Sequence, residues 1–143
     1  MILPDVNILV YAFRREAANH ELYASWLNRL VAGADELALH DLPLTGMVRI
    51  VTNRRILAEP APTEVALEFA DRLMFARRAR WLPSGRASWS RLRELAASDR
   101  AVAGNLFPDA FLASLAISNG CRLATADRGY ARFPGLEWFD PIR

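Results

Sequence analysis

Short apolar segments alternate with helix-like stretches along the whole chain, and this alternation limits the folds that the chain can adopt. The strand-like segments are MILP, ELALH, RARWLP, CRLAT and LEWFD. Between them, apolar spacing predicts helices in NHELYASWLNRLVAG, DLPLTGMVRIVTN, PTEVALEFADRLMFARR, SWSRLRELAASDR and FPDAFLASLAISNG. Strands alternating with helices favour a parallel sheet covered on both faces. We expect one α/β domain over residues 1–143, a three-layer sandwich around four to five short parallel strands.

Residue types that mark helix ends fit these boundaries. Gly33 is the expected C-cap of the first long helix, and Gly120 follows the last one. Thr63 is the expected N-cap of the helix in PTEVALEFADRLMFARR.

Composition excludes several classes of protein and site. No apolar run reaches the roughly 18 residues that span a bilayer, and the N-terminus has no basic region of a signal peptide, so we expect a cytoplasmic protein. All 18 basic residues are arginine, which excludes a P-loop lysine or a Schiff base. His20, His40 and Cys121 do not have the spacing of a zinc site. A bound metal would therefore be held by carboxylates, which favour Mg²⁺ or Mn²⁺.

The opening segment MILPDVNILVYAF would be one apolar run without Asp5 and Asn7. Burying an unpaired carboxylate is costly, so such a group usually neutralises or finds a cation. Two roles are open for Asp5 at this point: it caps the turn after the first strand, or it is one ligand of a metal site.

Further acids stand where the predicted strands end. Asp41 follows the second strand, Asp127 follows the fourth, and Asp109 opens the helix that leads into the fourth. The carboxyl ends of parallel strands share one edge of the sheet, where ligands bind. Asp109 reaches that edge only if the preceding AVAGNLF segment returns to it.

Each of these acids has a structural alternative: a helix cap for Asp41, a turn for Asp127 and a favourable helix dipole for Asp109. A cluster of all four would repel itself, and a divalent cation would remove that repulsion. Asn7 and Thr125 are candidates for orienting the carboxylates by hydrogen bonds, with turn formation as their alternative.

Three motifs resemble those of PIN-domain ribonucleases, in particular VapC-type toxins of toxin–antitoxin pairs. LPDVNILVYA is similar to the opening motif of that family, and GMVRIVTNRRI to the segment after its second acid. FPDAFLASLAISNGCRLATADRGYARFPGLEWFDP resembles the closing block. The resemblance covers nearly the whole chain and implies a PIN-like sandwich.

The resemblance further implies an endoribonuclease that depends on Mg²⁺ or Mn²⁺. The implied metal ligands are Asp5, Asp109 and Asp127, and Asp41 completes the implied catalytic set. The family usually carries a Glu on the helix after the second strand, where this chain has none; Asp41 lies one helical turn before Leu44, near the usual place of that Glu. The implied partners are an RNA substrate, a VapB-like antitoxin and a second copy of the chain in a homodimer, with no membrane.

Arginine clusters offer a positive approach for RNA. Arg54 and Arg55 are the preferred phosphate contacts. Arg77, Arg78 and Arg80 are further candidates, Trp81 is a candidate for base stacking, and a solvated surface is the alternative for all of them. A PIN fold without activity, serving only to bind an antitoxin or RNA, is the competing reading of the whole chain.

Overall fold

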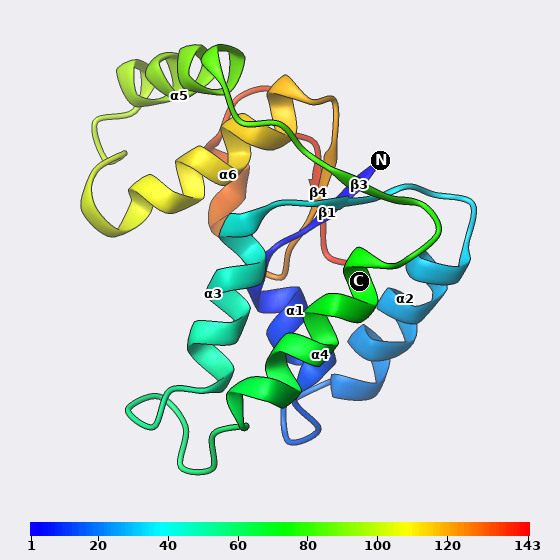
Figure 1. The fold of residues 1–143 in the computed structure, drawn as a ribbon. Helices are drawn as coiled ribbons and strands as arrows, with labels where there is room; N and C mark the ends of the chain where they lie inside the picture. Colours follow the sequence, from blue (N-terminus) through cyan, green and yellow to red (C-terminus); the bar gives the residue numbers. More distant parts are fainter.

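A central sheet of five parallel strands organises the computed structural model, which describes residues 1–143 (Figure 1). The strand order is β3-β2-β1-β4-β5, and every neighbouring pair is parallel. The first strand of the chain is thus the central one. The strands are β1 (Ile2–Pro4), β2 (Leu37–Leu39), β3 (Ala79–Trp81), β4 (Arg122–Ala124) and β5 (Trp138–Phe139).

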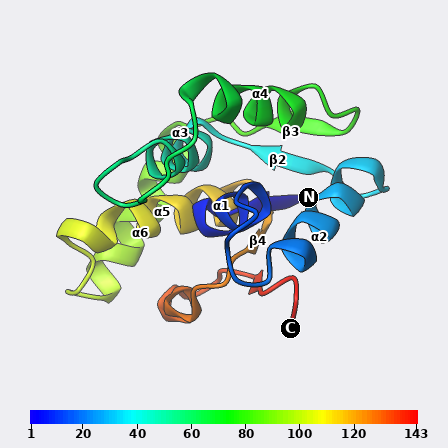
Figure 2. The same cartoon turned by 90° about the horizontal axis from the view of Figure 1, so that it is seen from below.

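Helices cover both faces of this sheet. They are α1 (Val6–Phe13), α2 (His20–Ala32), α3 (Asp41–Val51), α4 (Thr63–Met74), α5 (Arg86–Ser98) and α6 (Phe107–Ser118), with short 3₁₀ helices η1 (Gly104–Leu106) and η2 (Arg128–Arg132). In both views α5 and α6 lie together, away from α2 and α4 (Figures 1 and 2). The expected three-layer α/β sandwich is therefore confirmed.

Alternation along the strands builds two separate cores. Ile2 packs into the core formed with α1 to α4, and its neighbour Leu3 packs into the core formed with α5 and α6. Leu123 and Ala124 of β4 divide in the same way. Successive strand side chains point to opposite faces, so these nearly continuous apolar strands are buried on both sides.

Helix ends differ from the sequence-based expectation at two places. His40, not Asp41, is the N-cap of α3, because its Nδ1 accepts a hydrogen bond from the Leu42 amide at 3.1 Å. Thr63 is the first residue of α4 and not its cap, since Pro62 precedes it as N-cap without a side-chain bond. Gly120 lies past α6 with a φ of +63°, as the helix-end pattern predicts.

Chain direction brings four segments to one edge of the sheet. Helix α1 begins directly after β1, α3 directly after β2, and η2 shortly after β4. The α6 helix begins near the same edge after η1, so the AVAGNLF segment does return there. No helix of the chain is long and apolar enough to cross a membrane.

Candidate metal and phosphodiester site

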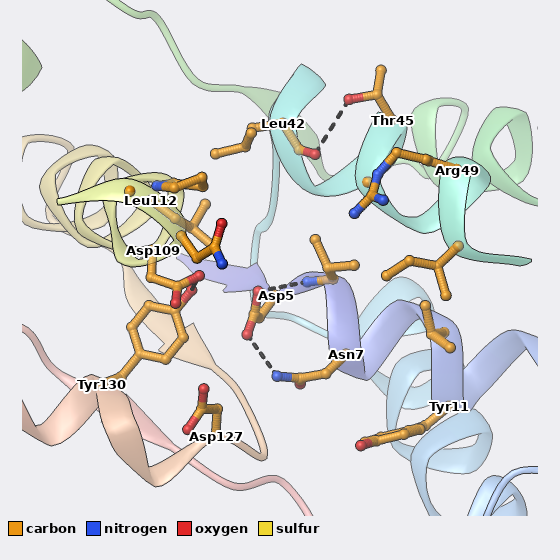
Figure 3. Close-up of a pocket in the computed structure, with 17 residues that line it drawn as sticks. Asp5, Asn7, Tyr11, Leu42, Thr45, Arg49, Asp109, Leu112, Asp127 and Tyr130 are labelled. Carbon is orange, nitrogen blue, oxygen red and sulfur yellow. Dashed lines mark hydrogen bonds between the residues drawn. The ribbon is translucent and has the colours of Figure 1, made fainter. Parts of the chain in front are cut away.

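A cavity of about 970 Å³ opens at the carboxyl edge of the sheet (Figure 3). Its walls come from the β1–α1 junction, one face of α3, the start of α6, and the segment after β4. Asp5, Asp109 and Asp127, which are 104 and 18 residues apart in sequence, all line it. Of the four acids expected at this edge, Asp5, Asp109 and Asp127 line the cavity, and Asp41 does not.

Asp5 is both a helix cap and a lining residue, so its two possible roles do not exclude each other. Its Oδ1 accepts from the Val6 amide at 2.7 Å, which caps α1. Its Oδ2 accepts from Asn7 Nδ2 and from Thr125 Oγ1, each at 2.7 Å. A carboxylate has about four lone-pair positions. The position left over belongs to Oδ1, which is where Asp5 can bind a cation.

Thr125 ties the N-terminal segment to the strand that precedes Asp127. Its side chain is fully buried, and its hydroxyl donates to Asp5 while accepting from Asn7 Nδ2 at 3.0 Å and from the Asp127 amide at 3.1 Å. Asn7 closes the network from the other side, since its Oδ1 accepts from the Ala126 amide at 3.1 Å. Asn7 and Thr125 therefore do orient a carboxylate by hydrogen bonds.

Asp109 and Asp127 reach the cavity from different elements. Asp127 makes the turn into η2, because its Oδ1 accepts from the Gly129 amide at 2.7 Å. A Cβ at Gly129 would lie 2.9 Å from that oxygen, so glycine permits the close approach. Asp109 is the third residue of α6, and the buried Tyr130 hydroxyl donates to its Oδ1 at a long 3.4 Å.

Burial sets the electrostatics of this acidic group. The pKa of Asp5 is raised from 3.8 to about 6. Desolvation by burial is the largest cause, the hydrogen bonds from Thr125 and Val6 oppose it, and the charges of Asp109 and Asp127 add to it. The pKa of Asp109 is also raised, first by burial and then by Asp127. Carboxylates that resist ionisation next to one another are stabilised by a divalent cation.

The donor set fits a hard cation. All candidate ligands are carboxylate oxygens, which Mg²⁺ and Mn²⁺ prefer. No group of three acidic, histidine or cysteine side chains is arranged to hold a metal ion by itself. Water and substrate oxygens would have to complete the coordination, as is usual for Mg²⁺.

Helix α3 forms the wall that faces these acids. Leu42, Thr45, Gly46 and Arg49 line the cavity from it, at the spacing of one helical face. A Cβ at Gly46 would lie 2.8 Å from Val6 Cγ2, so glycine lets α3 pack closely against the start of α1. This close packing holds α3 next to the segment that carries Asp5.

Several predicted site residues lie elsewhere. Asp41 is exposed at the first position of α3 and does not line the cavity, although its neighbour Leu42 does. Arg54 and Arg55 are exposed in the turn after α3, also outside the lining, at the end of that helix far from the sheet (Figure 1). Trp81 is half exposed on β3 at the sheet edge, outside the cavity lining.

The sequence reasoning did not single out two lining residues that bear on the chemistry of the site, Tyr130 and Arg49. Tyr130 stands three residues after Asp127, within the quoted closing block. Arg49 follows Leu42 by seven residues, two helical turns, so the helical spacing of the α3 face was the signal that could have found it.

Comparison with known proteins identifies the family. The model of the PIN domain family matches residues 2–136. The chain belongs to the PIN-domain family. It is 41% identical over 142 residues to VapC ribonuclease Mb2897 of Mycobacterium bovis and to ribonuclease VapC43 of Mycobacterium tuberculosis, covering 99% of this chain and 96% of each relative. Ribonuclease VapC31 of Mycobacterium tuberculosis is 32% identical over 143 residues, 99% of each chain.

Solved structures show the same PIN fold. The crystal structure of VapBC2 from Rickettsia felis, bound to a DNA fragment from its promoter, superposes with a TM-score of 0.70 at 22% identity, covering 97% of this chain and 98% of that one. VapBC-1 of nontypeable Haemophilus influenzae gives 0.68 at 18% identity over the full length of both chains. The family match and the 41% identical VapC relatives confirm the resemblance to VapC-type PIN domains found in the sequence motifs, and these structures confirm the fold.

Proposed function

We propose that this PIN-domain protein is a metal-dependent endoribonuclease that cleaves RNA phosphodiesters. The observation that carries the proposal is the meeting of Asp5, Asp109 and Asp127 in one cavity, in a chain whose relatives are ribonucleases. These three residues would hold Mg²⁺ or Mn²⁺. When bound, such an ion activates water and stabilises the negative charge that develops on the phosphodiester.

The chain's own residues have separable roles in this scheme. Asp5 presents one free position of Oδ1 in a direction fixed by three hydrogen bonds. Thr125 and Asn7 keep that orientation, and Tyr130 restrains Asp109. Such outer hydrogen bonds typically change metal affinity or activity about 10- to 100-fold. Asp41 stays a predicted catalytic residue whose side chain would have to turn towards the cavity.

The proposal includes a biological setting as toxin of a toxin–antitoxin pair. The structural neighbours are VapBC complexes, so we propose a VapB-like antitoxin as partner, a homodimer as the assembly and the cytoplasm as the place of action. Exposed apolar side chains on and after α4, namely Val65, Leu67, Met74 and Phe75, give such partners a surface to cover. Expression of the chain alone should arrest growth, and co-expression of the adjacent antitoxin gene should restore it; harmless expression of soluble chain would favour an inactive binding module.

The decisive experiment is cleavage of RNA by the purified chain with Mg²⁺ or Mn²⁺, compared with EDTA. Asp5→Asn should abolish cleavage, while Asp71→Asn, which removes an exposed carboxylate of α4 outside the cavity, should retain it. Circular dichroism of both variants controls for folding. Cleavage that persists in EDTA or in Asp5→Asn would overturn the proposal.

A further inference from the structure

One positive charge lines the cavity among three carboxylates. Arg49 is the only basic residue in the lining, and it comes from the middle of the α3 wall. Figure 3 shows its guanidinium directed into the cavity, on the side opposite Asp109 and Asp127. Arg54 and Arg55, which the sequence predicts as phosphate contacts, lie beyond the end of the same helix.

Arg49 has no partner within the protein. No carboxylate lies within 4.0 Å of it, whereas Arg132 pairs with Asp99 at 2.9 Å and Arg80 with Glu36 at 3.2 Å. Its guanidinium makes no hydrogen bond either. One turn earlier, the Thr45 hydroxyl donates to the Asp41 carbonyl at 2.6 Å, so Arg49 supplies the free side-chain donors of this wall.

The position of Arg49 does not support a role in neutralising the three carboxylates. A cation placed for that purpose would pair with one of the carboxylates. Asp5 and Asp109 instead take their hydrogen bonds from other groups: Asp5 from Val6, Asn7 and Thr125, and Asp109 from Tyr130. The guanidinium is thus left for something that enters the cavity between the two walls.

We propose that Arg49 binds a backbone phosphate of the RNA. It would so hold the RNA strand against the opposite wall of the cavity, which carries Asp5, Asp109 and Asp127 and is called the carboxylate wall below. This inference rests on the proposed function, because the entering anion is taken to be a phosphodiester. The planar fork of arginine fits two phosphate oxygens at once. The close α3–α1 packing at Gly46 fixes the distance between this contact and Asp5, so Arg49 sets where the strand lies relative to the acids.

The test measures binding and cleavage separately. Affinity of a short single-stranded RNA of mixed sequence is measured across a salt series with Ca²⁺ in place of Mg²⁺, on the intact chain, Arg49→Gln, Arg49→Lys and Arg93→Gln. Arg93 is the matched control, an exposed arginine of α5 without ion pair or hydrogen bond and outside the cavity. Thermal denaturation controls for folding. Cleavage by the intact chain is assayed in parallel with Mg²⁺ or Mn²⁺.

Arg49→Gln should weaken RNA binding about tenfold and lower the salt slope by about 0.7, the value of one phosphate contact to a single strand. Arg49→Lys should recover the salt slope but only part of the affinity, since it keeps the charge and loses the fork. Arg93→Gln should match the intact chain. Equal affinity of Arg49→Gln and the intact chain, equal losses in Arg49→Gln and Arg93→Gln, or no RNA binding at all would overturn the inference.

Failure of the proposed function gives a different result. If the intact chain binds RNA but does not cleave it with either metal, ribonuclease activity is wrong while the binding series still decides the role of Arg49. If the chain cleaves RNA and Arg49→Gln binds it normally, the ribonuclease proposal stands and the phosphate contact is wrong.

Discussion

The two walls of the cavity are built on opposite principles. The carboxylate wall is anchored by a buried, internally bonded acid: Asp5 is 5% exposed, and its partner Thr125 is 0% exposed. Every buried polar side-chain atom in the chain has a hydrogen-bond partner. Asp109 is half-buried, and Asp127 is exposed at the mouth of the cavity. The α3 wall is exposed, and its one charged group, Arg49, is unpaired. The carboxylate wall is therefore preorganised before a ligand binds, whereas the α3 wall keeps a free cation that can bind the ligand.

Of the substitutions that test this difference between the walls, Asp109→Asn should have the largest effect on the cleavage rate. Losing a ligand of the carboxylate wall should reduce cleavage to below about 1% of the intact rate, since even removal of outer partners costs about 10- to 100-fold. The metal-free variant should melt slightly higher at neutral pH, because a repelling charge with a raised pKa is gone. Rates under saturating Mn²⁺ and melting curves in EDTA measure the two effects. Near-full activity would remove Asp109 from the site.

The burial of Asp5 in this wall also predicts that the free energy of unfolding of the metal-free protein depends on pH. The folded state keeps the proton of Asp5 up to a pKa of about 6, while the unfolded chain loses it near 3.8. The folded state thus binds more protons between these values, so the free energy of unfolding falls as pH rises through this window, by up to about 3 kcal/mol.

Urea denaturation in EDTA at pH 4, 5, 6 and 7 measures this fall. Asp5→Asn should flatten the curve, and Mn²⁺ should oppose the fall because the ion binds the ionised form. The lowered pKa of Asp99 acts below this window and does not compete. Stability that rises from pH 4 to 6 in the intact chain would contradict the buried, metal-free state of Asp5.

Thr125→Val tests whether the hydrogen bonds of the carboxylate wall, rather than its charges, make it rigid. The substitution keeps the shape and removes a hydroxyl that serves Asp5, Asn7 and the Asp127 amide. We expect Mn²⁺ affinity to fall about 10- to 100-fold and stability to fall by about 1–3 kcal/mol. Thr125→Ser should restore most of both. Calorimetric titration with Mn²⁺ separates the affinity from the folding effect, and unchanged affinity would mean that the network is only structural.

Asp41→Asn should have the smallest effect. Its side chain is exposed outside the cavity and would have to turn to reach it, so the substitution should reduce cleavage less than Asp5→Asn does. The rate is compared with that of Asp5→Asn under saturating metal. Complete loss in both variants would show that the α3 wall contributes an acid to catalysis after all.

Sequence patterns specified the carboxylate wall better than the α3 wall, for a physical reason. Asp5 and Asp127 interrupt or end apolar strands, and strand ends in a parallel sheet share an edge, so local position was enough to bring them together. Arg49 is one of 18 basic residues, and its role depends on which helical face turns towards the acids. That orientation follows from packing at Gly46, a tertiary contact that single-sequence spacing does not report.

Tertiary contacts also explain why the N-cap of α3 differs from the sequence-based expectation. The position of α3 was expected, but its cap was not, because the His40 ring is held both by the Leu42 amide and by Ser84 Oγ at 2.7 Å, 44 residues further along the chain. Asp41 was favoured as a possible cap by residue type alone. Long-range hydrogen bonds of this kind override local preferences.

The hydrogen bond between Thr125 and Asp5 joins residues 120 positions apart. During synthesis, the central strand β1 is made before the other strands. Asp5, which follows it, can bond Thr125 only after β4 has been made. A ribosome-bound chain that ends before residue 125 contains most of the fold's helices but lacks Thr125, one of the three groups that orient Asp5. A nascent chain beside ribosomal RNA therefore lacks a complete site until residue 125 has been synthesised and has reached Asp5.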